Sequence, residues 1–319
     1  MEFKLDSKRA IRSAYGEALQ ELGAENPTMV VLDADLSCST KTSMFAEKYP
    51  DRFFNVGVAE QNMMSMAAGF AIEGRLVFAS TFAMFGAGRA WEQVRNSIAY
   101  DNLNVKVVLT HAGLTVGKDG ASHQIIEDLS LMRVIPNMRI FVPCDFSETK
   151  AVIKHAAKMT GPVYVRLCRE NMLDIYPDDY EFDFSTPNTL IEGSDVTIFS
   201  CGYMVAESIK AAQELAREEI SAQVVDMHTI KLMDVESVVN SAKNTGAIVT
   251  AEEHSIFGGL GSGVAEILSE SYPTPMKRVG VMDKFGVSGP APKLMQAYNL
   301  TSQDIVNACR EVIARKKTV

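Results

Sequence analysis

The chain has 319 residues, of which 47% are hydrophobic and 22% are charged. This length allows two medium-sized domains with cores of their own, and the composition excludes disordered and fibrous proteins. The formal net charge is -9 and the chain has no basic cluster, so we expect neither nucleic acid nor an anionic membrane as a partner.

Short apolar runs alternate with helical patterns over the first part of the chain. The runs are continuous, which is typical of strands buried on both faces of a parallel sheet. We therefore predict a doubly wound α/β domain, the first of two, over residues 1–175. The expected strands are Met29–Leu32, Phe53–Val56, Leu76–Ser80, Val105–Thr110, Arg139–Val142 and Val163–Leu167. The expected helices are Ile11–Leu22, Gln61–Ile72, Trp91–Ala99, Gln124–Val134 and Ser147–Met159.

A polar, proline-containing stretch then interrupts the alternation, and it predicts an interdomain linker over residues 176–190. A second α/β domain is expected over residues 191–319. Its expected strands are Val196–Ser200, Ala222–Met227, Ala247–Thr250 and Lys277–Val281. Its expected helices include Val205–Ala216, Gly261–Ser269 and Ser302–Arg315.

Targeting and metal signals are missing from the sequence. No apolar run approaches the roughly 18 residues of a membrane helix, and the start, MEFKLD, lacks the apolar core of a secretory signal. The five cysteines are scattered and no CxxC pair exists, which predicts neither a zinc site nor a disulfide framework. We expect a reduced, cytoplasmic protein that supplies no metal ligands of its own.

The densest chemical signal is the segment FNVGVAEQN at residues 54–62. A strand is expected to end there, a glycine to turn the chain, and Glu60 to begin a helix. On spacing alone, the simpler explanation of Glu60 is a first-turn acid that the helix dipole favours.

Two further signals follow the next two strands. Phe82 and Phe85 are three residues apart, so on a helical turn they share one face. The segment THAGLTVGKDGASH at residues 110–123 places His111, Asp119 and His123 around a glycine-rich loop. Ligand sites of α/β sheets lie at the carboxyl ends of strands. Taken singly, a core aromatic pair and structural histidines explain these residues equally well.

Taken in order, these segments resemble the pyrimidine-binding domain of transketolase, a thiamine-diphosphate enzyme. The second half is similar to the C-terminal domain of the same family, and the resemblance covers nearly the whole chain. Each piece alone is common, whereas the ordered set is specific. The matching pieces of the first half are DADLS (33–37), FNVGVAEQN (54–62), AAG (67–69), STFAMF (80–85), the loop at 110–123, IPN (135–137) and Pro143 with Glu148. Those of the second half are EEH (252–254), FGGLGS (257–262), DKFG (283–286) and SG (288–289).

The resemblance implies that four of these residues lie at or near the cofactor. It implies that Glu60 hydrogen-bonds the aminopyrimidine ring of thiamine diphosphate and so promotes the imino form that activates the cofactor. Phe82 and Phe85 are expected to form an aromatic wall against that ring. Asp35 is expected near the cofactor or the subunit contact.

The resemblance also implies a set of substrate-binding residues. His111 and His123 are expected to contact the sugar and to serve in proton transfer, and Asp119 is expected to accept from a sugar hydroxyl. Arg169 matches a position that holds the terminal phosphate, which suits a planar guanidinium. The sequence departs from the family at Lys118, where the family often has glutamate. Arg9 and Ser39 match further phosphate contacts, although Arg9 is equally explained as a solvated charge.

One part of a complete transketolase is missing from this sequence. The family binds the cofactor diphosphate and Mg²⁺ (or Ca²⁺) through a Gly-Asp-Gly motif with a later asparagine, and this chain has no Gly-Asp-Gly. The resemblance is therefore to the C-terminal subunit of a two-chain transketolase. Its expected partner is an N-terminal subunit in an α2β2 assembly that also associates through the pyrimidine-binding domain. The expected substrates are pentose-phosphate-pathway sugars such as xylulose 5-phosphate, ribose 5-phosphate and erythrose 4-phosphate.

Three alternatives stay open beside this interpretation. Deoxyxylulose-phosphate synthase shares both domains, but its pattern differs at the position of His111. The β subunit of a 2-oxoacid dehydrogenase E1 component has a different glutamate motif and lacks the GKDGASH loop. A non-catalytic regulatory homologue is disfavoured by the presence of Glu60, both phenylalanines and both histidines.

Overall fold

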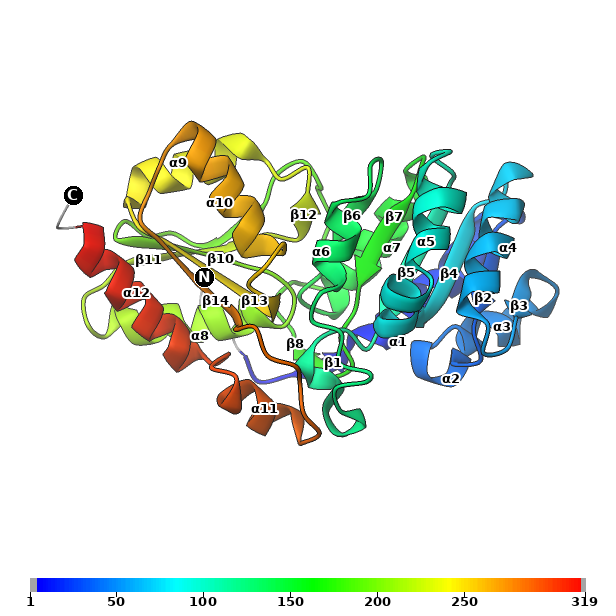
Figure 1. Cartoon of the computed structure of the whole chain (residues 1–319), viewed down its shortest axis with the longest axis horizontal. Coiled ribbons are helices and arrows are strands. Elements are labelled where there is room, and N and C mark those ends of the chain that lie inside the picture. Colours follow the sequence, from blue (N-terminus) through cyan, green and yellow to red (C-terminus); the bar gives the residue numbers. More distant parts are fainter. Residues whose placement is uncertain (1–4, 317–319) are drawn as a thin grey trace.

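The computed structural model describes residues 5–316 and consists of two α/β units that lie side by side (Figure 1). Each unit has a central, mostly parallel sheet with helices on both faces. The predicted fold class is therefore confirmed. We call the two parts the N-terminal unit and the C-terminal unit. Among the described helices, none is long and apolar enough to cross a membrane.

The N-terminal unit is built on a seven-stranded sheet with the order β12-β6-β7-β5-β4-β2-β3. All neighbours pair in parallel except β12, which runs antiparallel to β6 at one edge. Every residue of β4 and β5 is buried, which explains their continuous apolar sequences. The strands are β2 (Val30–Asp33), β3 (Phe53–Asn55), β4 (Val77–Phe82), β5 (Val105–Thr110), β6 (Arg139–Phe141), β7 (Val163–Arg166) and β12 (Thr229–Lys231).

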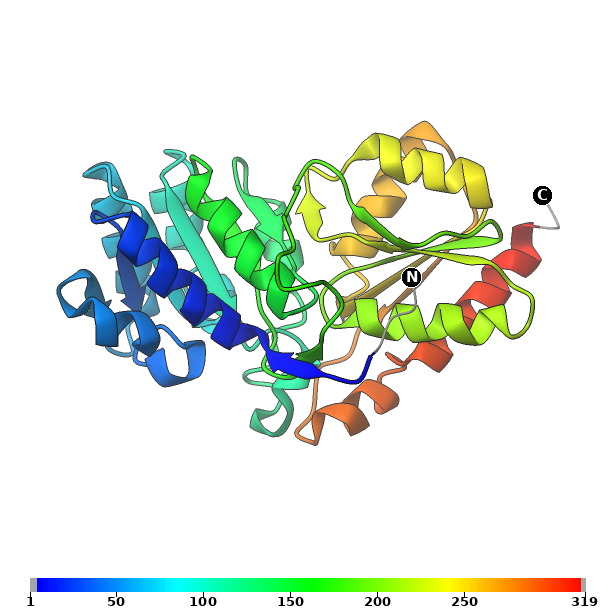
Figure 2. The same ribbon diagram turned by 180° about the vertical axis from the view of Figure 1, so that it is seen from behind.

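Helices cover both faces of this sheet. One face carries α1 (Ile11–Glu25), α3 (Ser43–Lys48) and α7 (Phe146–Lys158), with α1 and α7 in front in Figure 2. The other carries α4 (Glu60–Ile72), α5 (Trp91–Gln93) and α6 (Asp128–Arg133). The buried side chains of α1 recur at helical spacing, so a single apolar stripe faces the sheet.

Two predicted helices differ from the structure. The stretch 91–99 is only briefly α-helical, because α5 passes into a π-helical segment, η3 (Val94–Ala99). A second π-helical segment, η2 (Met84–Arg89), follows β4 directly. Its backbone passes so close to Leu109 that a Cβ added at Gly86 lies 2.5 Å from that side chain. The predicted helix 124–134 is reduced to α6, because the backbone of Ile125 instead forms a β-bridge with Ala112.

The C-terminal unit has a five-stranded sheet with the order β14-β13-β10-β11-β9, in which only β9 is antiparallel to its neighbour. Helices α8 (Met204–Ala216) and α12 (Ser302–Lys316) cover one face, and α9 (Val235–Thr245) and α10 (Leu260–Ser271) cover the other (Figure 1). The strands are β9 (Asn188–Ile191), β10 (Val196–Ser200), β11 (Ala222–Asp226), β13 (Ile248–Ser255) and β14 (Met276–Val281).

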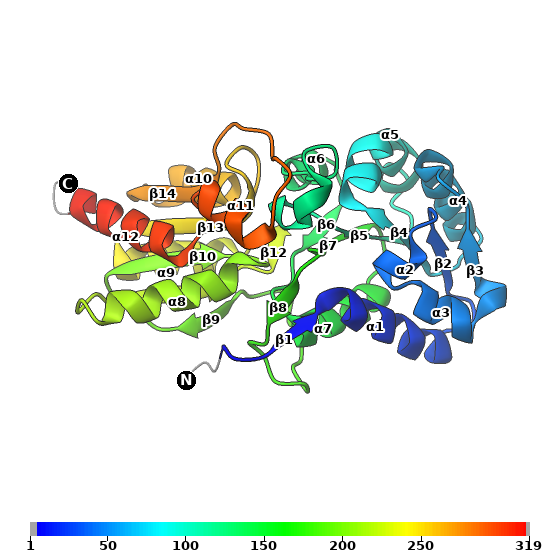
Figure 3. The same ribbon diagram turned by 90° about the horizontal axis from the view of Figure 1, so that it is seen from below.

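The two units are joined more closely than a linker requires. Strand β12 belongs to the C-terminal half of the chain but extends the first sheet, and β9 begins inside the predicted linker at Asn188. Strand β1 (Lys8–Ala10) pairs with β8 (Asn171–Leu173) below the junction. One apolar cluster runs without a break from α4 and β4 to α9 and α10. Helix α11 (Ala291–Ala297) packs against the N-terminal unit, as Figure 3 shows from below.

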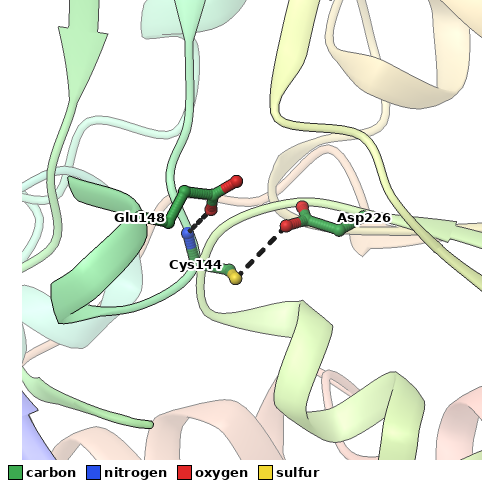
Figure 4. A group of neighbouring side chains, drawn as sticks. All are labelled: Cys144, Glu148 and Asp226. Atoms are coloured by element: carbon green, nitrogen blue, oxygen red, sulfur yellow. Dashed lines mark hydrogen bonds between the residues drawn. The ribbon is translucent and has the colours of Figure 1, made fainter. Parts of the chain in front are cut away.

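Three buried groups of acidic character meet at this junction (Figure 4). The Cys144 N–H donates to Glu148 Oε2 at 2.7 Å, and the Cys144 thiol donates to Asp226 Oδ2 at 3.3 Å. Tyr176 donates to the same Asp226 oxygen at 2.9 Å. Glu148 Oε1 and Asp226 Oδ1 are buried and have no hydrogen-bond partner. Within residues 5–316, no lysine or arginine pairs with either carboxyl group.

A carboxyl group that keeps its proton accounts for this cluster better than two ionised carboxylates. Burial raises the pKa of Asp226 to about 7, and burial followed by the nearby Asp226 raises the pKa of Glu148 well above its ordinary value. The charge of Asp145, which caps α7, and the phenols of Tyr176 and Tyr180 also face this pair. Two carboxyl groups this close cannot both ionise at low cost, so the pair keeps a proton near neutral pH.

We predict that Asp226→Asn makes stability less dependent on pH. The folded-state pKa of Asp226 lies above its unfolded value, so its stabilising effect is complete below about pH 4 and is lost as the pH rises to about 7. One such proton corresponds to about 1.4 kcal/mol per pH unit. Denaturant midpoints measured across this range should fall less steeply for Asp226→Asn than for the wild type. The exposed control Asp101→Asn should keep the wild-type slope, and equal slopes in all three proteins would show that Asp226 does not keep a proton in the folded state.

Candidate active site

Glu60 lies at the first position of α4, where the chain turns at Gly57 after β3. The residue is only 2% exposed, and its Oε2 accepts from Arg89 Nη1 at 3.1 Å. Its Oε1 makes no hydrogen bond within the described residues, which leaves one acceptor available. The Arg89 guanidinium carbon also lies 4.8 Å from the ring centre of Phe85. Glu60, Arg89 and Phe85 are therefore contiguous.

Four rings continue this group at the ends of β4 and β5. Phe82 and Phe85 are stacked with their centroids 6.1 Å apart. His111 stacks on Phe82 at 3.8 Å, and His123 meets Phe85 edge-on at 5.4 Å. The prediction that the phenylalanines share a helical face is wrong, because Phe82 is the last residue of β4. The π-helical turn after the strand brings the two rings together instead.

His111 occupies a constrained position directly after β5. Its φ angle is 58°, a left-handed value that is uncommon for residues other than glycine. Its Nδ1 lies 2.9 Å from Thr110 Oγ1. Burial, reinforced by the positive charges of Arg12 and Arg169, lowers the pKa of His111 to about 3. The imidazole is therefore neutral at physiological pH and serves as a hydrogen-bonding group without a charge.

A cavity of about 660 Å³ with several cations in its wall lies near His111. Arg169, which lines the cavity, donates from Nη1 to Val116 O at 2.5 Å and lies 3.8 Å from Asp119 Oδ1, so these two predicted residues are neighbours. The far wall is the chain between β14 and α11. The lining residues are Lys8, Arg12, Val116, Gly117, Lys118, Arg169, Glu170, Asn171, Gly289, Pro290, Ala291 and Pro292.

Arg12, which the sequence analysis did not single out, lines this cavity, whereas Arg9 does not. Arg9 lies in β1 and pairs with Asp174 at 2.7 Å and with Asp178 at 2.8 Å. Arg12 lies in the first turn of α1, and its Nη1 donates to the carbonyl of Ser39 at 2.7 Å. Its Nε is buried without a partner. No sequence signal distinguishes the two arginines, because the choice depends on where α1 begins.

Ser39 and Asp35 lie in the segment after β2 and outside the cavity lining. Ser39 belongs to α2 (Ser37–Thr40), which the buried Asp33 holds in place by accepting from Thr40 and Thr42. Asp35 has a φ of 64° and exchanges hydrogen bonds with the side chain of Asn55. Asp35 is exposed at the end of β2, next to β3, and is free to contact another molecule.

The C-terminal unit fastens the loop that carries Asp119. The backbone N–H of Thr115 donates to Glu253 Oε1 at 2.6 Å. Gln124 Nε2 donates to the carbonyls of Gly117 and Val287, each at 3.0 Å. These contacts hold η4 (Leu114–Asp119) against the second unit. The EEH motif contains Glu253, but only the structure shows that it reaches this loop.

Glu60, Phe82, Phe85, His111 and His123 therefore form one group, whereas Arg9, Ser39 and Asp35 lie outside it. A buried carboxylate with a free oxygen lies beside an aromatic pair, and a neutral histidine stacks on that pair. The positive charges of Arg12 and Arg169, which line the cavity, contribute to keeping this histidine neutral. Residues 7–173 match the family described as "Transketolase, pyrimidine binding domain", and residues 187–305 match "Transketolase, C-terminal domain". The chain belongs to the transketolase family. The resemblance seen in the sequence is confirmed by these matches.

Several proteins similar to this transketolase chain have nearly the same extent, whereas others are about twice as long. It is 48% identical to a "Putative transketolase C-terminal section" of Methanocaldococcus jannaschii, over 97% of this chain and 98% of that protein. It is 42% identical to a "6-deoxy-6-sulfo-D-fructose transketolase subunit" of a Clostridium species, over 99% and 98%. A solved structure described as "Split gene transketolase, inactive beta4 tetramer" superposes with a TM-score of 0.90 and 53% identity, over 97% of this chain and all of that one.

We predict that Gly113→Ala disrupts the hydrogen bond between Glu253 and the backbone of Thr115 that holds η4 against the C-terminal unit. Gly113 has a φ of 83°, and a Cβ added there lies 2.4 Å from Glu253 Oε1. Gly74 also has a positive φ of 78° but has open space around it, so Gly74→Ala measures backbone strain alone. We expect Gly74→Ala to lower the free energy of unfolding by about 1 kcal/mol and Gly113→Ala by roughly 3 kcal/mol. Equal losses in chemical denaturation would show that Glu253 can move aside freely.

Proposed function

We propose that this chain is the C-terminal subunit of a two-chain transketolase, which transfers a two-carbon ketol unit from a ketose phosphate to an aldose phosphate. The observation that carries the proposal is the contiguous group of Glu60, Arg89, Phe85, Phe82 and His111, in which His111 also feels the positive charges of Arg12 and Arg169 from the cationic cavity. Such an arrangement accommodates a flat ring at one end and a terminal anion at the other. The separate C-terminal sections among its relatives support the subunit assignment.

The residues fit thiamine diphosphate as the cofactor. Glu60 presents a free carboxylate oxygen inside a buried site, which suits a hydrogen bond to a nitrogen of the aminopyrimidine ring. Phe82 and Phe85 offer an aromatic wall for the same ring. When bound, the cofactor supplies a thiazolium carbanion that accepts the two-carbon unit. Arg89 orients Glu60 by pairing with its other oxygen.

The remaining residues are assigned to the sugar. Neutral His111, with its ring on Phe82, is placed to exchange hydrogen bonds with a substrate hydroxyl, and His123 lies opposite it on the aromatic pair. Asp119 accepts from a sugar hydroxyl. Arg169 binds the terminal phosphate at the cavity wall, as a guanidinium does well. We also propose that Arg9 and Ser39 contact a phosphate of the substrate, and we compare the role of Arg9 with that of Arg12 below.

The proposed partner is an N-terminal transketolase subunit that holds the cofactor diphosphate and its Mg²⁺ or Ca²⁺. This chain has no Gly-Asp-Gly motif for that task. The similar structure described as an inactive tetramer of β chains supports the need for a second chain. The proposed assembly is α2β2, with Asp35 near the cofactor or the subunit contact. A sulfonated ketose is a second candidate donor, which the 42% identical relative supports.

We predict that ketol transfer requires both chains and depends on Glu60. The assay measures transfer from xylulose 5-phosphate to ribose 5-phosphate, with thiamine diphosphate and Mg²⁺ present. We expect activity only when this chain is mixed with its N-terminal partner, and a loss of kcat on the order of 10²- to 10⁴-fold for Glu60→Ala. Full activity of this chain alone would overturn the two-chain proposal. Full activity of a folded Glu60→Ala mixture would overturn the role of Glu60.

We also predict that Arg12, more than Arg9, determines affinity for the phosphate end. Arg12 lines the cavity, whereas Arg9 is already neutralised by Asp174 and Asp178. In the reconstituted enzyme, Arg12→Ala should raise KM for ribose 5-phosphate roughly 10-fold or more, since a charged hydrogen bond contributes about 1.5–3 kcal/mol. Arg9→Ala should change KM less than Arg12→Ala does. The reverse order of the two effects would favour Arg9 as the phosphate residue.

A further inference from the structure

The wall of the cationic cavity contains two lysines that form no ion pair within residues 5–316. Four cationic residues, Lys8, Arg12, Lys118 and Arg169, line it together with one carboxylate, Glu170. Arg12 and Arg169 already donate to backbone carbonyls, and Arg169 also lies near Asp119. Within residues 5–316, neither Lys8 nor Lys118 forms an ion pair. The cavity therefore carries more positive charge than two phosphate-binding arginines supply.

The C-terminal unit fixes the backbone of Lys118 at the rim of the cavity. Ser288 Oγ donates to the carbonyl of Lys118 at 2.7 Å. The neighbouring Gly117 is equally confined, because a Cβ added there lies 3.3 Å from the carbonyl oxygen of Gly289. Lys118 itself is exposed, so its ammonium group stays hydrated and mobile while its attachment point does not move. Lys118 is thus a cationic side chain at the cavity whose backbone is held in place by the C-terminal unit.

We propose that Lys118 is a specificity residue, which favours substrates whose terminal group carries two negative charges over those with one. This inference rests on the proposed function, in which the cavity receives the terminal group of the sugar. A phosphate monoester is mostly a dianion at neutral pH, because its second pKa is about 6. A sulfonate has one negative charge. Coulomb energy scales with the product of charges, so each added cation stabilises the dianion about twice as much.

The expected effect is modest because Lys118 is exposed. Ion pairs in contact with water contribute about 0.2–1 kcal/mol, which corresponds to roughly a 1.4- to 5-fold change in affinity. Replacing the cation by a carboxylate adds repulsion to the lost attraction. We therefore expect Lys118→Glu to weaken binding of a phosphate roughly 3- to 10-fold and Lys118→Gln to weaken it less. A sulfonate should be affected less than a phosphate by both changes.

The test is a binding experiment on the full chain, because this chain supplies every residue that lines the cavity. Dissociation constants are measured by calorimetry at neutral pH and low salt for D-fructose 6-phosphate and 6-deoxy-6-sulfo-D-fructose, two ketoses of equal chain length. The proteins are the wild type, Lys118→Glu, Lys118→Gln and the control Lys158→Glu. Lys158 is exposed and is the last residue of α7. This end of α7 lies beside the first residues of β5, at the edge of the sheet opposite to the site.

The inference is supported if the wild type binds the phosphate more tightly than the sulfonate and Lys118→Glu reduces that ratio while Lys158→Glu does not. It is overturned if Lys118→Glu behaves as the wild type, if both ligands weaken equally, or if the wild type binds neither ligand at millimolar concentration. Because binding is measured without turnover, these outcomes are independent of ketol transfer. A reconstituted enzyme without transfer would overturn the proposed function, and the binding ratio would still decide the role of Lys118.

Discussion

The site depends on the parallel pairing of the strands in the N-terminal unit. Because β3, β2, β4, β5 and β7 all run the same way, their carboxyl ends lie at one edge of the sheet. Glu60 follows β3, Phe82 ends β4, His111 follows β5 and Arg169 follows β7. These residues are up to 109 positions apart, from Glu60 to Arg169 (169 minus 60), yet they share one edge without any special loop. The chemistry of the site is thus a product of strand order.

The C-terminal unit contributes to this edge although Glu60, Phe82 and Phe85 all come from the N-terminal unit. Glu253 accepts from the backbone of Thr115, and Gln124 connects Gly117 to Val287. A loop with glycines at positive φ has little stiffness of its own, so contacts from outside must define its position. The second unit therefore holds the loop at residues 114–119 in position and also forms a wall of the cavity.

The sequence was sufficient for the fold class and for most strands and long helices, because buried parallel strands and amphipathic helices have strong periodic signals. It was insufficient where the signal is non-local. The π-helical turn after Phe82, the pairing of β12 with β6 and the partner of Glu60, Arg89, all depend on contacts between distant segments. The choice between Arg9 and Arg12 required the start of α1, which periodicity places only to within a few residues.

Strand β12 has a consequence for how this protein can be divided. The polar stretch at 176–187 lies between the two units and is an obvious place to cut the chain. A cut there would remove β12, which follows the stretch and pairs with β6, so that β6 would become the edge strand of the first sheet. A fragment that ends in the linker would expose the unpaired backbone of β6 and part of the shared apolar core, both of which promote aggregation. The two units therefore form a single cooperative body, and a cut at this joint is disfavoured physically, whatever the activity of each unit.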